Sequence, residues 1–173
     1  IRRRCTRPAF PFEAARCVGE AIREVHARDA AGMTAFGLDF NVQCILGGQV
    51  AGERPRLFNV CPAGNFIEAT PDPSYFQIGE FKYGKPIIDR VITRESSLAE
   101  AAKCALISMD STIRSNLSVG MPIDLVLVRT GELRVGHHRV IGAEDEYFGA
   151  IRNGWGEALR NAFKALPDPD LSG

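Results

Sequence analysis

The chain has 173 residues, of which 45% are hydrophobic and 24% are charged, and its 21 basic and 21 acidic side chains cancel. This composition is typical of a globular protein, and the balanced charge gives no electrostatic case for binding nucleic acid or an anionic membrane. No apolar run approaches the roughly 20 residues that cross a bilayer. We therefore expect one cytoplasmic domain over residues 1–173, with neither nucleic acid nor a membrane as partner.

Cysteines and histidines are the residues that could hold a metal. The five cysteines include no Cys-x-x-Cys pair, which a structural zinc site would use, and their odd number favours reduced thiols in the cytoplasm. His137 and His138 are adjacent, and neighbouring residues of a strand point to opposite faces of its sheet. We therefore expect no bound metal and no cofactor.

The first elements along the chain are a helix and three strands. Apolar residues at helical spacing predict an amphipathic helix over residues 11–28, which Gly32 is expected to stop. Three apolar segments then follow, separated by turns at residues 52–55 and 61–65, and the second turn has the proline and glycine of a three-residue hairpin. This pattern predicts an antiparallel meander. The chain opens Ile-Arg-Arg-Arg, so we expect that the natural N-terminus is missing and that the arginines are solvated.

The rest of the chain predicts helices around a second strand pair. A short helix follows Gly84, and a longer one begins at Ser97, where Glu100 completes a capping box. The segments PIDLVLVRT and LRVGHHRVI form the strands, and the acidic residues 144–146 open a last helix. The predicted buried stripe of this helix consists of Tyr147, Ile151, Trp155, Leu159 and Phe163. Antiparallel strands with helices on their outer faces indicate an α+β layered sandwich.

Small polar residues gather where the long helix meets the next strand. They are Ser115, Asn116, Ser118 and Gly120. Serine and asparagine commonly end helices, so the cluster has an ordinary structural interpretation. Functional residues also concentrate in loops at the ends of elements, so the cluster is equally a candidate site.

Four segments of the chain resemble proteasome β-type subunits. TIRSNLSVGMPIDLVLV resembles the family's helix ending in Arg-Asp-x-x-Ser-Gly-Gly and the strand that follows it. YFQIGEFKYGKPIID, RLFNVCPAGNFIEAT and SLAEAAKCALISMDSTIRSN resemble the preceding glycine-containing stretch, strand pair and long helix. The resemblance covers most of residues 8–165 and is strongest to a bacterial proteasome-related branch. It implies the four-layer αββα sandwich of N-terminal nucleophile hydrolases, with the first strands missing from this chain.

The resemblance also implies a mechanism whose central groups this chain lacks. In that family an N-terminal threonine attacks a peptide carbonyl, its own α-amine acts as the base, and a lysine lowers the local pKa. Residue 1 here is Ile1. We expect the nucleophile, the lysine and the oxyanion glycine upstream of it, and no catalytic residue in this chain. The missing strands are also expected to leave sheet edges unpaired and apolar surface bare.

What the resemblance places in this chain is the supporting half of the site. The family's Asp-x-x-Ser pattern falls on Ser115 and Ser118, and its glycine–serine pair falls on Gly79 and Glu80. Ser118 keeps the family residue, whereas Ser115 replaces the aspartate and Glu80 replaces a serine. Asn116 takes the aspartate's place only if the alignment slips by one residue. The two replacements are expected to compensate for each other.

Three functions remain open from the sequence. The first is a subunit of a self-assembling, proteasome-like threonine-type peptidase or amide hydrolase, of which this chain carries the supporting half of the site. The second is a non-catalytic structural subunit of the same fold, and the third is a small-molecule amidase. The expected partners are identical subunits in a ring or open spiral, and a peptide or amide substrate.

Overall fold

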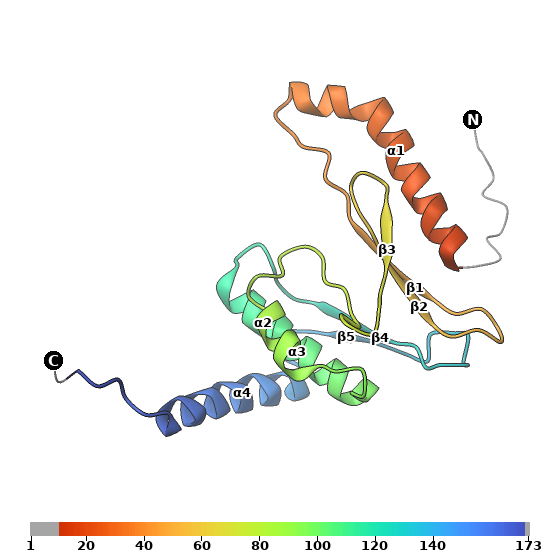
Figure 1. Ribbon diagram of the computed structural model, residues 1–173. Helices are drawn as coiled ribbons and strands as arrows, with labels where there is room; N and C mark the ends of the chain where they lie inside the picture. The colour runs from red at the N-terminus through yellow and green to blue at the C-terminus, as the bar shows by residue number, and fades with distance from the viewer. Residues whose placement is uncertain (1–10, 172–173) are drawn as a thin grey trace. The chain divides into compact units, whose positions relative to one another are not determined.

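A computed structural model describes residues 11–171, within which the chain forms four helices and two small sheets (Figure 1). The predicted α+β class is confirmed. The described chain divides into two compact units, one made of the residues up to Gly79 together with Leu127–His137, and the other of Glu80–Val126 together with the residues from His138 onward. Assignment of 1–173 to one proteasome-type domain stays a prediction. The expectations for Ile1, for the arginines at 2–4 and for Cys5 lie outside the described residues.

The first unit is a helix packed on an antiparallel meander, as predicted. Helix α1 (Pro11–Ala35) packs on strands β1 (Cys44–Gly48), β2 (Arg56–Val60) and β3 (Phe66–Glu68), which pair in the order β1-β2-β3 (Figure 1). Period-two alternation along β2 puts one set of its side chains against the helix. The core consists of Ala15, Ile22, Phe58 and Val60.

The prediction that Gly32 stops the first helix is wrong, because α1 continues to Ala35. A glycine near a helix end costs only about 1 kcal/mol, which packing elsewhere along the helix offsets. The stop lies at Gly37, whose φ of 71° is left-handed. The Leu38 N–H donates to the Met33 carbonyl and the Gly37 N–H to the Thr34 carbonyl, both at 3.0 Å, which is a Schellman motif.

The hairpin turn between β2 and β3 contacts α1 backbone to backbone. Gly64 has a φ of 75° and its N–H donates to the Cys61 carbonyl at 2.8 Å, which confirms the predicted left-handed glycine. A Cβ added to Gly19 would meet the Gly64 carbonyl oxygen at 2.1 Å. The same oxygen accepts a hydrogen bond of 2.7 Å from Nη1 of Arg23. Only glycine at position 19 permits this approach.

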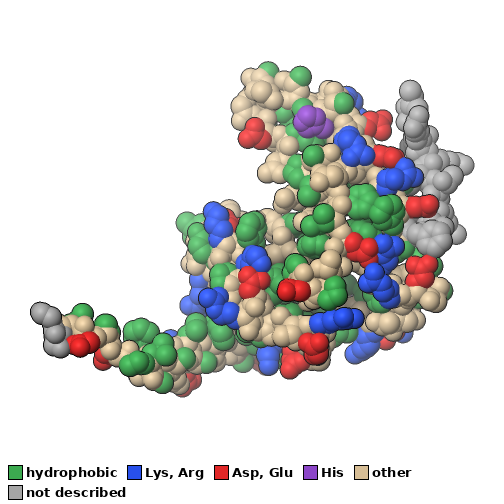
Figure 2. All heavy atoms as spheres, viewed as in Figure 1, with side chains coloured by type: hydrophobic (Ala, Val, Ile, Leu, Met, Phe, Trp, Pro, Cys, Tyr) green, Lys and Arg blue, Asp and Glu red, His purple; other side chains and the backbone are tan. Residues whose placement is uncertain are grey.

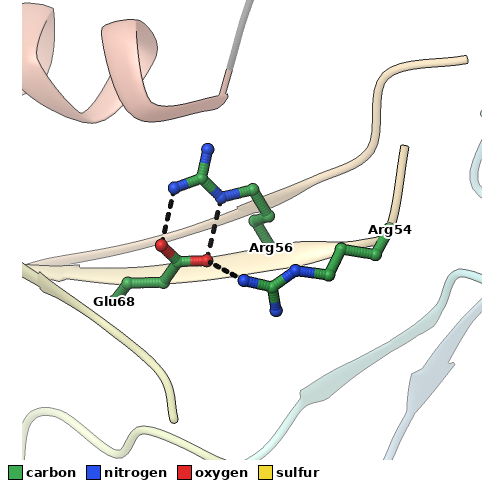
Figure 3. A network of polar contacts seen from close by, with 3 residues as sticks. All are labelled: Arg54, Arg56 and Glu68. Carbon is green, nitrogen blue, oxygen red and sulfur yellow. Dashed lines mark hydrogen bonds and ion pairs between the residues drawn. The ribbon is translucent and has the colours of Figure 1, made fainter. Parts of the chain in front are cut away.

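A network of two arginines and one carboxylate ties β3 to β2 and to the residues before it (Figure 3). Nε and Nη2 of Arg56 donate to Oε1 and Oε2 of Glu68 at 2.8 and 2.6 Å, and Nη2 of Arg54 donates to Oε1 at 3.2 Å. The Arg56 guanidinium also lies 5.0 Å from the centre of the Phe58 ring. Hydrogen bonding to Arg56 lowers the pKa of Glu68. This carboxylate is thus fully used in holding the sheet.

The second unit is built from three helices and the second sheet. Helices α2 (Lys85–Val91), α3 (Leu98–Ser115) and α4 (Glu146–Ala165) accompany strands β4 (Ile123–Leu127) and β5 (His137–Ile141), of which Leu127 and His137 belong to the first unit. The two strands pair, as predicted. The core consists of Leu106, Ile123, Ile141 and Phe148.

The two long helices of this unit begin at the predicted caps. The Ser97 N–H donates to Oε2 of Glu100 at 2.8 Å, and the Glu100 N–H donates to Oγ of Ser97 at 3.2 Å, which completes the capping box. The first of these bonds lowers the pKa of Glu100. Asp145 caps α4 by accepting from the Phe148 N–H at 2.9 Å. That bond, from a helix N-terminus, lowers the pKa of Asp145.

Each sheet exposes apolar side chains on the face opposite its helices. In the first sheet, Ile45 is 37% and Ile67 is 55% exposed, and in the second, Val126 is 49% and Val140 is 56% exposed. The strand neighbours of Ile45, Ile67 and Val126 are half-buried, and Ile141, next to Val140, is buried. The expectation of bare apolar surface agrees with this pattern.

The stripe predicted to bury α4 is wrong for Tyr147, Leu159 and Phe163, which are all exposed. Phe148 is the buried residue of this helix. Trp155 is half-buried and lines a groove of about 450 Å³ between α2, α3 and α4. On the face shown in Figure 2, exposed apolar side chains are interspersed with acidic and basic groups. Helical periodicity identified the apolar side of α4 but not which part of it another element covers.

The expectation that all cysteines are reduced is wrong at Cys17, which forms a disulfide. Cys44, Cys61 and Cys104 are free thiols. Burial raises the pKa of Cys104, which is the behaviour of a small core residue.

Candidate functional site

The candidate site is the junction where α3 ends and the chain turns toward β4. Asn116 is the C-cap of α3, with extended backbone angles of φ −138° and ψ 113°. Its N–H still donates to the Thr112 carbonyl at 2.9 Å, and its carbonyl accepts from the Val119 N–H at 3.2 Å. Backbone hydrogen bonds on both sides therefore fix the place where Asn116 leaves the helix.

The side chain of Asn116 joins two segments that are far apart in sequence. Its Nδ2 donates to Oε2 of Glu80 at 3.0 Å. Its Oδ1 accepts from the backbone N–H of Ser118 at 2.8 Å and from the Ser118 hydroxyl at 2.7 Å. Glu80, Asn116 and Ser118 thus form one continuous polar cluster, which we call the junction cluster.

The junction cluster presents hydrogen-bond acceptors. Oε2 of Glu80 is bound by Asn116, while Oε1 has no donor within residues 11–171. The nearest cation is Nζ of Lys82, 3.9 Å from Oε2, on a side chain that is itself 73% exposed. The Ser118 hydroxyl donates its proton to an amide oxygen, which leaves its own lone pairs to accept. An amide is not a base, so nothing here prepares Ser118 to act as a nucleophile.

The four site residues expected from the sequence differ in how they relate to this cluster. Glu80 and Ser118 are brought together by Asn116. Gly79 precedes Glu80 with a left-handed φ of 76° and turns the chain into that residue. Ser115 is exposed and its side chain makes no hydrogen bond in the described part of the chain. The roles of all four stay predictions.

Asn116 is the residue that sequence reasoning undervalued. The family pattern places the aspartate at Ser115 and reaches Asn116 only if the alignment slips by one residue. The available signal was chemical, because the amide of an asparagine carries a donor group and an acceptor on separate atoms and can link a carboxylate to a hydroxyl.

The described residues contain no group of three or more His, Cys, Asp or Glu side chains that could hold a metal ion. Nε2 of His138 lies 2.8 Å from Oδ1 of Asp124, so this ring is paired with a carboxylate. Between residues 11 and 171, no helix has the length and apolar character needed to cross a membrane.

Comparison with family models and with curated proteins gives no match, whereas solved structures match closely. The chain is 45% identical to the protein in the helical assembly of the Anbu complex from Pseudomonas aeruginosa, with a TM-score of 0.87 over 94% of this chain and 67% of that one. The chain belongs to the Anbu family. Anbu, the ancestral β-subunit, from Yersinia bercovieri is 51% identical, with a TM-score of 0.85 over 93% of this chain and 66% of that one.

A third Anbu structure, from Hyphomicrobium sp. strain MC1, is 52% identical, with a TM-score of 0.83 over 92% of this chain and 64% of that one. The chain therefore spans about two thirds of the length of these Anbu proteins. The resemblance to a bacterial proteasome-related family, which was drawn from the sequence, is confirmed.

Proposed function

We propose that this chain is the supporting part of a proteasome-like subunit and that its junction cluster accepts hydrogen bonds from the reactive amine of a threonine-type peptidase or amide hydrolase. The observation that carries the proposal is the arrangement of Glu80 and Ser118 around Asn116, in which the described residues leave acceptor atoms unused and do not activate Ser118 as a nucleophile. The nucleophile, the lysine and the oxyanion glycine are expected on a segment outside residues 1–173.

The chemistry of such a site requires acceptors of this kind. When an α-amine takes the proton of the threonine hydroxyl it becomes an ammonium group, which has three N–H donors to satisfy. Oε1 of Glu80 and Oγ of Ser118 supply acceptors. The carboxylate charge favours the ammonium form and raises the pKa of the amine from its usual value of about 8. The cluster therefore stabilises the protonated state that forms as the threonine attacks.

The proposal includes the four-layer sandwich. Each described sheet carries helices on one face and exposed apolar side chains on the other, and an inner layer of a sandwich has these two faces. Burying Ile45, Ile67, Val126 and Val140 against a further sheet layer or further strands would remove apolar surface that is costly to expose.

The proposal also includes self-assembly into a ring or open spiral. An Anbu protein from Pseudomonas aeruginosa forms a helical assembly. The exposed apolar stripe of α4 gives this chain surface for a neighbouring subunit, and head-to-tail contacts between identical subunits generate rings or helices. The same stripe supports the alternative of a structural subunit without catalysis.

Hydrolysis of fluorogenic peptide amides and small amides by the complete gene product tests the proposal. Ser118→Ala removes an acceptor for a charged donor, which is worth about 1.5–3 kcal/mol, so kcat/KM should fall roughly 10- to 100-fold. Ser74→Ala is the matched control, because Ser74 is exposed and makes no described hydrogen bond. An assembled protein that hydrolyses neither substrate class would overturn the catalytic proposal in favour of the structural one.

A further inference from the structure

We propose that Asn116, and not Ser115, takes the place of the family's aspartate and positions both acceptors of the site. The inference rests on the proposed function and deepens it by assigning a positioning residue. It is carried by the three hydrogen bonds through which one side chain contacts both Glu80 and Ser118.

The donor half of the Asn116 amide positions the carboxylate. Nδ2 donates to Oε2 of Glu80 at 3.0 Å, and the Glu80 side chain is only 23% exposed. Because Oε2 is held in this way, the carboxylate is fixed through one oxygen, and no residue in the described part of the chain donates to Oε1. Lys82 reaches the carboxylate from an exposed position at 3.9 Å and restrains it less.

The acceptor half of the amide positions the hydroxyl. Oδ1 receives both the N–H and the O–H of Ser118, at 2.8 and 2.7 Å. Since the hydroxyl proton points to Asn116, the lone pairs of Oγ point away from it. An incoming ammonium group would therefore find Ser118 already oriented as an acceptor.

The Glu80 carboxylate explains why a neutral side chain, and not a second carboxylate, stands at position 116. A carboxylate at position 116 would place like charges about as far apart as the present 3.0 Å hydrogen bond between Asn116 and Glu80. The negative charge that the family resemblance puts at the helix end has instead moved to Glu80. Asn116 positions the acceptors and Glu80 supplies the negative charge. In this way the glutamate at position 80 compensates for the loss of the family's aspartate.

Asn116→Asp in the complete gene product separates these two parts, because it keeps an acceptor for Ser118 and turns the donor to Glu80 into a second negative charge. The added charge raises the pKa of the amine, so the acidic limb of the profile of kcat/KM against pH should move up by about one unit. At a pH below that limb, kcat/KM should fall about tenfold. Asn161→Asp makes the same charge change at an exposed position of α4 and should leave the limb in place.

Two further measurements make the outcome decisive. A limb that moves with Ser115→Asp but not with Asn116→Asp would overturn the proposal. In thermal unfolding, Asn116→Ala should be non-additive with Glu80→Ala and with Ser118→Ala, since each pair shares a hydrogen bond, whereas strictly additive Tm losses would contradict the coupling. If the unmodified protein hydrolyses no amide, the proposed function fails, and the unfolding cycle alone still decides whether Asn116 couples the two acceptors.

Discussion

Two glutamates in this chain, Glu68 and Glu80, are each held by a side chain distant in sequence. They differ in how many of their carboxylate oxygens are used by those contacts. Both oxygens of Glu68 accept from the Arg56 guanidinium, and Oε1 accepts from Arg54 as well (Figure 3). Glu80 accepts from one neutral amide through Oε2, and no residue among 11–171 donates to its Oε1. A carboxylate whose two oxygens are both paired with guanidinium groups stabilises a sheet, whereas one held by a neutral donor at a single oxygen keeps an acceptor for a ligand.

The largest loss of stability in the unit that contains Glu68 is expected from a substitution at Gly19, where α1 contacts the turn between β2 and β3. Gly19→Ala places a Cβ 2.1 Å from the Gly64 carbonyl oxygen, so backbone must move and the free energy of unfolding should fall by at least about 2 kcal/mol. Gly32→Ala is the matched control in the same helix, since nothing lies within 4 Å of its added Cβ. Higher helix propensity should make that variant more stable, by up to about 1 kcal/mol. Equal Tm values for the two variants would contradict the close approach.

A smaller loss is expected from Glu68→Gln, which keeps the shape of the side chain and removes its charge. The bidentate pair with Arg56 is lost, and Tm should fall by roughly 2–4 °C without any change in the pH profile of activity. Differential scanning calorimetry of the variant and the parent measures the effect. A Tm equal to that of the parent would show that the network contributes nothing to the sheet.

The pH dependence of this contribution has a defined sign. The pKa of Glu68 is lowered in the folded state by hydrogen bonding to Arg56, so its stabilisation is present above the unfolded-state value of 4.5 and is lost as the pH falls through the lowered folded-state pKa. The difference in stability between parent and Glu68→Gln should therefore be fully present above the unfolded-state pKa of 4.5 and should shrink progressively over the pH range below it. A constant difference across that range would contradict the assignment.

Local signals predicted most of the elements. The capping box at Ser97, the left-handed Gly64 and the acidic start of α4 each act through neighbours within a few residues, so the sequence shows them directly. The end of α1 was missed because the Schellman motif depends on Gly37, beyond the glycine that the pattern favoured.

The candidate site was only partly predictable, because it depends on a contact between residues that are distant in sequence. Family resemblance indicated Glu80 and Ser118, but the residue between them in space is Asn116, whose hydrogen bond spans 36 positions of sequence. The disulfide of Cys17 and the exposed stripe of α4 were missed too, because each depends on which partner surrounds a residue rather than on the residue's own pattern.

The pH profile of kcat/KM for Glu80→Gln in the complete gene product, compared with that of Glu68→Gln, decides whether the Glu80 carboxylate acts on the amine. Glutamine keeps one oxygen for Asn116, so Tm should change little, while loss of the nearby charge lowers the pKa of the amine and moves the acidic limb to lower pH by about one unit. Glu68→Gln should lower Tm and leave the limb in place. A limb that stays unchanged in Glu80→Gln would remove Glu80 from the site and contradict the account.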